Sequence, residues 1–289
     1  SQIIYPLYRR IFEYRHGEGI YVMERDWDNL ILLDACRYDV FKHNSTLEGE
    51  LTRVVSRGNA SWQFIEENFA GKQYHDTIYV TANPFVHTKL SEDTFYAVKT
   101  VVDDWDEDTG TVLPEDVTKT AIETANEYPT KRLIVHYMQP HAPHLGEIAQ
   151  NIDIQIAGWD KYMGQEQKAK MNEGITIWRL FKRGVLTRDQ LRKSYIQNLQ
   201  IVEDKLADLL KQLSGKTVIT SDHGENLGES YAGFTQLGHR KDTKECRFVP
   251  WLELEYDRRK EIVEEEPVGN QSPEGEYVNE KLRELGYLQ

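Results

Sequence analysis

Two polar segments of the sequence carry residue types that bind divalent metal ions. Asp34 directly follows an apolar run, and Asp222-His223 follows another apolar run far along the chain. Carboxylates and imidazoles are ligands of Zn²⁺, Mn²⁺ and Mg²⁺ in proteins. A buried Asp34 would be costly without a positive partner, which either a metal ion or Arg37 could supply. An ion pair with Arg37 and a simple turn at Asp222 are the alternatives without a metal.

A hydroxyl that could act as a nucleophile lies between these two segments. Ser61 ends the segment 56–61 and begins a pattern typical of a helix over 61–69. A hydroxyl at a helix N-terminus gains from the positive end of the helix dipole. Beside a divalent ion it could attack phosphorus or sulfur. Serine is also a preferred helix N-cap, so capping is the alternative role of Ser61, and Ser56 is the second candidate nucleophile.

Histidines are concentrated in the segment 136–144, which also contains two prolines. His141 could protonate a leaving group, because an imidazole changes its charge near neutral pH. His136 is interpreted as a buried strand residue, and a surface position is the alternative interpretation of His144. Three further residues are candidates for binding the substrate: Arg57, Asn83 and His239.

Strand-like apolar runs alternate with helical patterns along the chain. The expected strands are 29–33, 51–55, 77–81, 132–138, 217–220 and 248–254, and the main expected helices are 61–69, 114–128 and 190–213. This alternation predicts an α/β fold with a mixed, largely parallel central sheet and helices on both faces. Ligands of such sheets bind at the carboxyl ends of the strands, where most of the polar candidates fall. The sequence therefore predicts one shared site at that edge.

Composition and length limit the class of protein. The chain has 289 residues, a net charge of −13 and 39% hydrophobic residues. We expect one domain over 1–289, with a helical cap or insertion at 151–184 and a tail at 257–289. The acidic balance argues against nucleic-acid binding, which needs a basic surface. The oligomeric state is left open.

Membrane and secretion signals are not recognised in the sequence. No apolar run approaches the roughly 20 residues of a transmembrane helix, and no secretory signal opens the chain, so we predict a cytoplasmic protein. Residues 3–15 have a basic amphipathic pattern that could lie on a membrane, although packing on the domain is the preferred interpretation. Cys36 and Cys246 do not form a disulfide framework.

Several of these segments resemble the sulfatase-like branch of the alkaline phosphatase superfamily. The similar segments are 32–39 (LLDACRYD), 220–225 (TSDHGE), 238–239 (GH) and 247–250 (RFVP). The match runs from Trp27 to Leu254 and is similar to sulfatase-like proteins of halophilic archaea. It implies an α/β sandwich and one divalent ion, which could be Mn, Zn, Mg or Ca. The implied metal ligands are Asp34, Ser61, Asp222 and His223. The resemblance places His141 on the substrate side, and His239 at a position that contacts metal or substrate.

Two departures from that family narrow the expected chemistry. Sulfatases convert a Cys or Ser in Cys/Ser-x-Pro/Ala-x-Arg to formylglycine, and neither Cys36 nor Cys246 stands in such a motif. A direct hydroxyl nucleophile favours phosphoryl chemistry. Two-metal members carry Asp-x-x-x-His where this chain has Gln139-Pro140-His141, which favours one metal.

The predicted function is therefore a metal-dependent hydrolase of phosphate mono- or diesters that uses a serine nucleophile. Its substrate would be a small-molecule or glycan phospho- or sulfo-ester. The alternatives are a sulfatase, a transferase of phospho-alcohol groups onto glycans, and a non-catalytic protein that binds anionic glycans.

Overall fold

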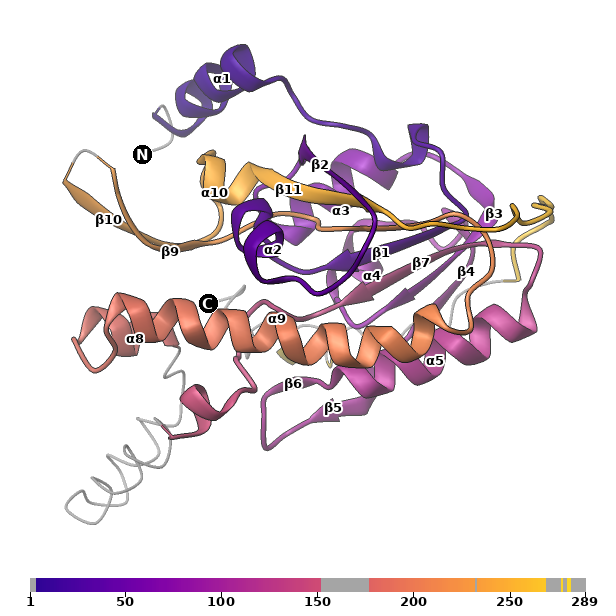
Figure 1. Ribbon diagram of the computed structural model, residues 1–289. Helices are drawn as coiled ribbons and strands as arrows, with labels where there is room; N and C mark the ends of the chain where they lie inside the picture. Colours follow the sequence, from indigo (N-terminus) through magenta and orange to yellow (C-terminus); the bar gives the residue numbers. More distant parts are fainter. Residues whose placement is uncertain (1–3, 152–176, 232, 269–276, 278–279, 282–289) are drawn as a thin grey trace.

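The centre of the fold is a seven-stranded sheet with the order β2-β11-β8-β1-β7-β3-β4 (Figure 1). The computed structural model describes residues 4–151, 177–231, 233–268, 277, 280 and 281. The strands of this sheet are β1 Asn29–Leu33, β2 Glu50–Val55, β3 Tyr74–Thr81, β4 Phe95–Thr100, β7 Arg132–Tyr137, β8 Thr217–Thr220 and β11 Phe248–Glu253. β11 runs antiparallel to both of its neighbours, and the other pairs are parallel. The predicted mixed, largely parallel sheet is confirmed.

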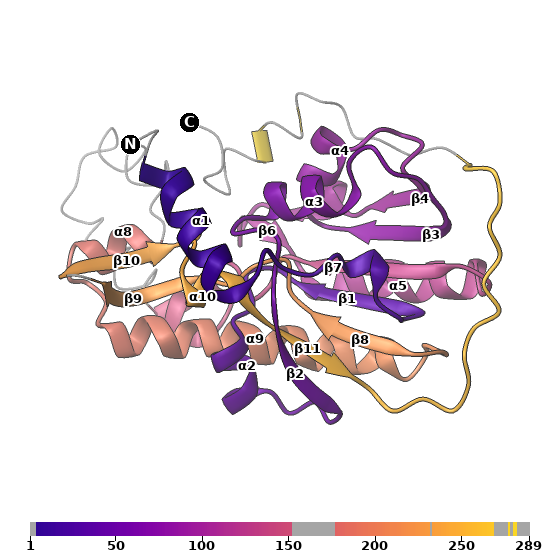
Figure 2. The same cartoon turned by 90° about the horizontal axis from the view of Figure 1, so that it is seen from above.

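Helices and two small antiparallel pairs surround the sheet. The helices are α1 Ile4–His16, α2 Tyr38–Asn44, α3 Ser61–Phe69, α4 Phe85–Lys89, α5 Pro114–Glu127, α8 Ile177–Lys182, α9 Arg188–Leu210 and α10 Lys244–Arg247, with short 3-10 turns at Val22–Glu24 and Val102–Asp104. The pairs are β5 Trp105–Asp106 with β6 Thr111–Val112, and β9 Asn226–Tyr231 with β10 Phe234–Gly238. Both views place the hairpin β9–β10 at one end of the molecule (Figures 1 and 2).

The two faces of the sheet form two hydrophobic cores. All five residues of β1 are buried, because the strand is central and covered on both sides. Leu30 and Leu32 belong to the core that contains Phe64 and Phe69 of α3. The intervening Ile31 and Leu33 belong to the core formed with α5 and α9, the two helices beneath the sheet in Figure 1. Each such side chain stabilises the fold by about 1.5–3 kcal/mol, and together they fix where β1 ends.

The amino-terminal helix packs on the domain, as the preferred interpretation expected. The ring of Phe12 lies 5.9 Å from the ring of Phe248, and Arg9 forms an ion pair with Glu67 at 2.9 Å. Tyr14 points outward and is 92% exposed. Among the helices of the described residues, none combines the length and hydrophobicity needed to cross a bilayer.

Residues 257–268 form an irregular strap, as the sequence predicted for the start of the tail. The strap is bound near the amino ends of β1 and β7 and beside β3 and β4. Arg259 binds Asp28, the Val263 amide donates to the Thr130 carbonyl, and the Val268 amide donates to the Tyr96 carbonyl. Most of the predicted insertion, 152–176, lies outside the described residues, and so does most of the short helix expected near 278–285. The single-domain organisation and the cap stay predictions.

Some elements escape the sequence patterns. β4 and the hairpin β9–β10 were not predicted. In the hairpin, polar residues such as Glu229, Ser230 and Thr235 interrupt any apolar alternation. The predicted helix 190–213 begins two residues earlier and ends at Leu210. Thr187 forms a capping box with Gln190, which explains the earlier start.

Candidate active site

Three strand ends bring the predicted residues together. Asp34 directly follows β1, Asp222-His223 follows β8, and Asn83 follows β3. β1 lies between β8 and β7, and β3 is the next strand beyond β7. Asp34, Asn83, Asp222 and His223 are each 0% exposed. The carboxyl ends of neighbouring parallel strands lie at one edge, so these side chains converge beneath the surface.

The turn after Asp34 is held in a conformation that few residues adopt. Ala35 has a φ of +61°, a left-handed backbone that costs a non-glycine residue about 1–3 kcal/mol. Its amide donates to Asp222 Oδ1 at 3.1 Å, and its carbonyl accepts from the Tyr195 hydroxyl at 2.6 Å. The Cys36 amide donates to Ser221 Oγ at 2.8 Å. The turn therefore links the two loops that carry the carboxylates.

The motif Asp222-His223-Gly224 owes its glycine to close packing. A Cβ at Gly224 would lie 2.0 Å from the carbonyl oxygen of Glu245. His223 Nδ1 is 2.8 Å from the Gly224 carbonyl oxygen, which can only accept, so Nδ1 carries the proton and Nε2 presents a lone pair. His223 Nε2 lies 3.5 Å from an oxygen of Asp34 and 3.5 Å from an oxygen of Asp222.

Ser61 places its hydroxyl in this group. Its Oγ donates to Asp34 Oδ2 at 3.0 Å and lies 3.2 Å from His223 Nε2. Ser61 is the first residue of α3, and the N-cap is Ala60. The alternative role of Ser61 as the capping residue is therefore wrong.

Ser56, the second candidate nucleophile, is committed to the loop. Its hydroxyl donates to the Asp222 carbonyl and accepts from the Gly58 amide at 3.1 Å. A hydroxyl held on both sides by the backbone is poorly placed to attack a substrate. The geometry therefore favours Ser61.

The donor set fits a cation. Within the described residues, Asp34 Oδ1, Asp222 Oδ2 and His136 Nε2 are buried atoms that have no hydrogen-bond partner. His136 Nε2 lies 3.8 Å from Asp34 Oδ2 and 3.7 Å from Asp222 Oδ2. The ligating atoms of Asp34, His136 and Asp222 all lie within 4.8 Å of one another. Buried charges of one sign this close require a positive partner, and oxygen and imidazole donors suit a divalent metal.

The pKa values of Asp34 and Asp222 also indicate that these two carboxyl groups require a cation. Burial, and then the charge of Asp222, raise the pKa of Asp34 well above its usual range. Burial also opposes ionisation of Asp222, but His223 and His136 outweigh it and lower the pKa of Asp222. Without a cation, the pair therefore favours one proton, held on Asp34.

His136 is the residue of this group that sequence reasoning missed. It was interpreted as a core strand residue, and it is fully buried near the end of β7. However, its Nδ1 is 2.9 Å from the Tyr79 hydroxyl and its Nε2 faces the two carboxylates. A histidine inside the apolar run Leu133–Tyr137 was the available signal, because such a residue needs buried partners.

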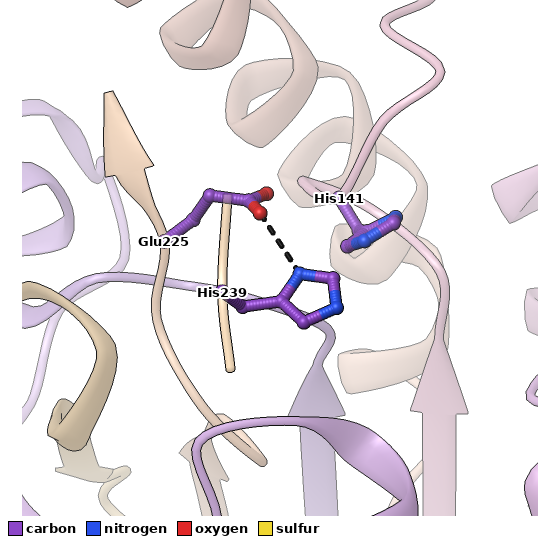
Figure 3. A group of neighbouring side chains, drawn as sticks. All are labelled: His141, Glu225 and His239. Carbon is purple, nitrogen blue, oxygen red and sulfur yellow. Dashed lines mark hydrogen bonds and ion pairs between the residues drawn. The ribbon is translucent and has the colours of Figure 1, made fainter. Parts of the chain in front are cut away.

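A second group of side chains consists of His141, Glu225 and His239 (Figure 3). The ligating atoms of His141, Glu225 and His239 lie within 4.8 Å of one another, and His239 Nδ1 is 3.0 Å from Glu225 Oε1. The rings of His239 and His223 are 4.8 Å apart. This group could bind a cation or exchange protons with a substrate. It contains His141, predicted on the substrate side, and His239, predicted to contact metal or substrate, and Glu225 completes it.

The structure brings Asn83 to the site but not Arg57. Asn83 Nδ2 donates to Asp34 Oδ2 at 2.9 Å, so it orients a carboxylate. The guanidinium of Arg57 instead lies 3.9 Å from the centre of the Tyr21 ring and 3.3 Å from Glu67. Gly58 packs so tightly on the backbone of Phe64 that a Cβ would approach it to 2.5 Å. Arg57 is itself buried, at 8% exposed, in these contacts away from Asp34.

Buried carboxylates, imidazoles and a serine hydroxyl therefore meet at the carboxyl edge of this sheet. The chain belongs to the sulfatase family, whose model matches residues 54–252, and it is a sulfatase-like enzyme. No curated protein matches it in sequence. The narrower resemblance to proteins of halophilic archaea stays a prediction.

Several solved structures are similar to this chain at low identity. The integral membrane protein lipooligosaccharide phosphoethanolamine transferase A from Neisseria meningitidis is 15% identical, with a TM-score of 0.50 over 78% of this chain and 47% of that chain. The C-terminal periplasmic domain of EcEptC from Escherichia coli, in complex with Zn, is 14% identical, with a TM-score of 0.47 over 81% and 75%. A putative sulfatase from Bacteroides thetaiotaomicron is 10% identical, with a TM-score of 0.47 over 89% and 70%.

Proposed function

We propose that the protein is a metal-dependent hydrolase of phosphate mono- or diesters in which Ser61 is the nucleophile. The observation that supports this most is the position of Ser61 Oγ, 3.0 Å from Asp34 and 3.2 Å from His223, beside buried carboxylate oxygens that lack a partner among the described residues. Asp34, Asp222 and His223 would hold the ion together with Ser61, and His136 lies within reach. A bound divalent ion would neutralise the carboxylates, favour the serine alkoxide and polarise the ester.

The residues of the chain then divide the reaction between them. Ser61 loses its hydroxyl proton to solvent, and its Oγ forms a bond to phosphorus while the bond to the leaving alcohol breaks. The amide groups at the start of α3 favour the negative charge of the phosphoryl group. Water then cleaves the bond from phosphorus to Ser61, which restores the hydroxyl and releases phosphate from a monoester substrate or a phosphate monoester from a diester.

His141 would assist the leaving oxygen, because its ring lies 5.2 Å from that of His239, which in turn lies 4.8 Å from that of His223. Burial lowers the pKa of His141 to about 4, so its ring is neutral near pH 7 in the free protein. A bound dianionic ester opposes this effect and favours the protonated ring, which can donate to the leaving alcohol. The neutral ring can then accept a proton from the attacking water.

Phosphorus rather than sulfur is favoured by the state of the cysteines. Both are buried free thiols, and the sequence around them lacks the formylglycine motif. Cys246 Sγ accepts from Asn226 Nδ2 at 3.0 Å, so it packs inside the hairpin region. The proposed nucleophile is therefore an unmodified serine.

Transfer to a glycan alcohol is the second candidate reaction. His239 is paired with the buried carboxylate of Glu225, and its ring lies next to His223. A histidine held in this way can take a proton from an alcohol as well as from water. We propose a small-molecule or glycan ester as the substrate, and cytoplasmic location stays a prediction.

A panel of esters tests the proposal. Metal-stripped protein would receive Mn²⁺, Zn²⁺, Mg²⁺ or Ca²⁺ and would be assayed on 4-nitrophenyl phosphate, bis(4-nitrophenyl) phosphate and 4-nitrophenyl sulfate. Metal-dependent turnover of a phosphate ester, with trapping of phosphate on Ser61, is the expected result. Turnover of the sulfate ester alone would support a sulfatase. Faster release of nitrophenol when a glycan alcohol is added, with phosphorylated glycan as product, would support the transferase.

A further inference from the structure

One buried side chain of α9 binds most of the backbone around His141. Asn198 is 0% exposed. Its Nδ2 donates to the carbonyl oxygens of Pro140 at 3.1 Å, His141 at 3.0 Å and Pro143 at 3.4 Å. Its Oδ1 accepts from the Leu145 amide at 2.9 Å. A single amide group therefore satisfies four backbone groups of one loop, and buried backbone groups require such partners.

The loop is held from the other side by the metal-ligand turn. The His141 amide donates to the Asp34 carbonyl at 3.0 Å, so the backbone of His141 is bound by Asp34 at its N–H and by Asn198 at its C=O. The His141 ring is fixed in turn, because its Nδ1 lies 2.6 Å from the Ala142 carbonyl. The position of this ring relative to Asp34 thus depends on Asn198.

The same face of α9 binds the Asp34 turn directly. The Tyr195 hydroxyl donates to the Ala35 carbonyl and accepts from the Arg37 amide at 3.0 Å. Ser194 Oγ is hydrogen-bonded to His144 Nδ1 at 2.9 Å. α9 is a 23-residue helix packed along the sheet, so its side chains provide a rigid reference for both loops. Sites positioned by regular elements are more precise than sites on loops alone.

We propose that Asn198 is a positioning residue that sets the His141 ring against the leaving oxygen of the substrate. This inference rests on the proposed function, because it assigns His141 to the leaving-group side. Misplacement of a catalytic group by about 1 Å can cost on the order of 10²-fold in rate. Loss of the Asn198 contacts should therefore reduce the assistance to the leaving oxygen without removing Ser61 or the metal ligands.

Leaving groups of different quality separate this role from a merely structural one. A nitrophenolate leaves readily without a proton, whereas a simple alkoxide needs one. Misplacement of His141 should therefore impair an alkyl phosphate far more than 4-nitrophenyl phosphate. General loss of structure or of metal would impair both equally.

The test variant is Asn198→Asp, which keeps the size of the side chain but turns the donor toward three carbonyls into an acceptor. We expect kcat/KM on the alkyl phosphate to fall about 10²-fold, the low end of general-acid contributions, and on 4-nitrophenyl phosphate only a few-fold. The matched control is Asn68→Asp. Asn68 is also a buried amide that binds backbone, with Val22 and Phe64 as partners. This control should leave the ratio of the two activities unchanged.

An equal loss on both substrates in Asn198→Asp, with metal content and fold intact, would overturn the proposal. If that variant does not fold, Asn198→Ser replaces it, because its hydroxyl can still donate to one carbonyl. Asn198→Ser should then lower the ratio of the alkyl phosphate activity to the 4-nitrophenyl phosphate activity by a smaller factor. An unchanged ratio would again overturn the proposal.

His141→Ala distinguishes a failure of this inference from a failure of the proposed function. If His141→Ala changes the ratio and the Asn198 variants do not, only the role of Asn198 is wrong. If His141→Ala lowers both activities equally, His141 does not assist the leaving oxygen and the proposed assignment of that residue is wrong.

Discussion

The two ends of β1 bury the same kind of side chain in opposite ways. Asp28 directly precedes the strand and is 1% exposed, whereas Asp34 directly follows it and is 0% exposed. Asp28 receives two hydrogen bonds from Arg259, at 2.7 and 2.9 Å, and further ones from the amides of Lys216 and Lys260. Asp34 receives bonds from Ser61 and Asn83, which are neutral, and its Oδ1 has no partner among the described residues.

The pKa values respond accordingly. Burial opposes ionisation of both groups, but the bonds from Arg259 and the two amides outweigh it and lower the pKa of Asp28. At Asp34, burial and the charge of Asp222 raise the pKa. The amino end of the strand therefore carries a carboxylate that the protein itself neutralises. The carboxyl end carries one that still requires a cation, as a functional site does.

The largest effect is expected on turnover, at the proposed nucleophile Ser61 beside the carboxyl end of β1. Ser61→Ala should reduce phosphoesterase turnover on the order of 10⁴-fold or more, because the covalent route is lost. Ser56→Ala is the matched control and should cost about 1 kcal/mol of stability through a lost hydrogen bond, with much less effect on turnover. Steady-state kinetics and urea unfolding measure the two effects. Full activity in Ser61→Ala would show that the nucleophile was assigned wrongly.

Variants near the two ends of β1 should also differ clearly in their metal content. Asp222→Ala should abolish binding of the divalent ion, because it removes one of the unpartnered buried oxygens. Asp28→Asn should keep the full stoichiometry, since the amino end has its own cation in Arg259. Elemental analysis of the folded variants gives the answer. Unchanged stoichiometry in Asp222→Ala would contradict the proposed ligand set.

The free energy of unfolding should depend more on the ion pair at the amino end of β1 than on the carboxylate at its carboxyl end. Arg259→Met leaves Asp28 buried without its cation, and we expect a loss of about 2 kcal/mol in the free energy of unfolding, less than for a fully buried pair because Arg259 is partly exposed. The midpoint of urea unfolding measures this, while kcat and metal content should stay unchanged. A variant as stable as the parent would mean that the two amides alone suffice for Asp28.

The same comparison predicts that substitution of Asp34 in metal-free protein raises the free energy of unfolding, whereas loss of Arg259 lowers it. In metal-free protein, Asp34→Asn removes one of two adjacent carboxyl groups that lack a cation, and should stabilise the fold by about 1 kcal/mol. Excess metal should stabilise the parent, by about 2.7 kcal/mol at 100 times the dissociation constant, and should no longer stabilise the variant. Thermal unfolding with and without metal tests both statements. Destabilisation of the metal-free variant would show that Asp34 is already compensated.

The smallest effect is expected at the thiols. Cys36 and Cys246 are buried and free, so intact mass analysis should show no modification, and two thiols should be labelled only after unfolding. A mass corresponding to an aldehyde hydrate at Cys36 would instead restore the sulfatase interpretation and remove the need for Ser61.

Much of this site could be predicted, because the end of each apolar run in the sequence marks the end of a strand. Asp34, Asn83 and Asp222-His223 were all found in this way, and Ser61 was found from the helix that it begins. His136 could not be found by the same rule, since it lies inside its strand and only the neighbouring strands show what its ring faces. Arg57 lies apart from this group for another reason, because its guanidinium packs on the Tyr21 ring and pairs with Glu67, contacts that the sequence pattern does not reveal.

The strap 257–268 has a consequence for how the chain folds during synthesis. Arg259 and Asp28 are 231 residues apart in sequence, although their side chains are in contact. Long-range contacts of this kind form slowly, because a long loop must close first. A ribosome has to release residue 259 before the buried carboxylate of the earliest strand receives its cation. Until then, Asp28 lacks the cation that the strap supplies at the end of β1 opposite Asp34.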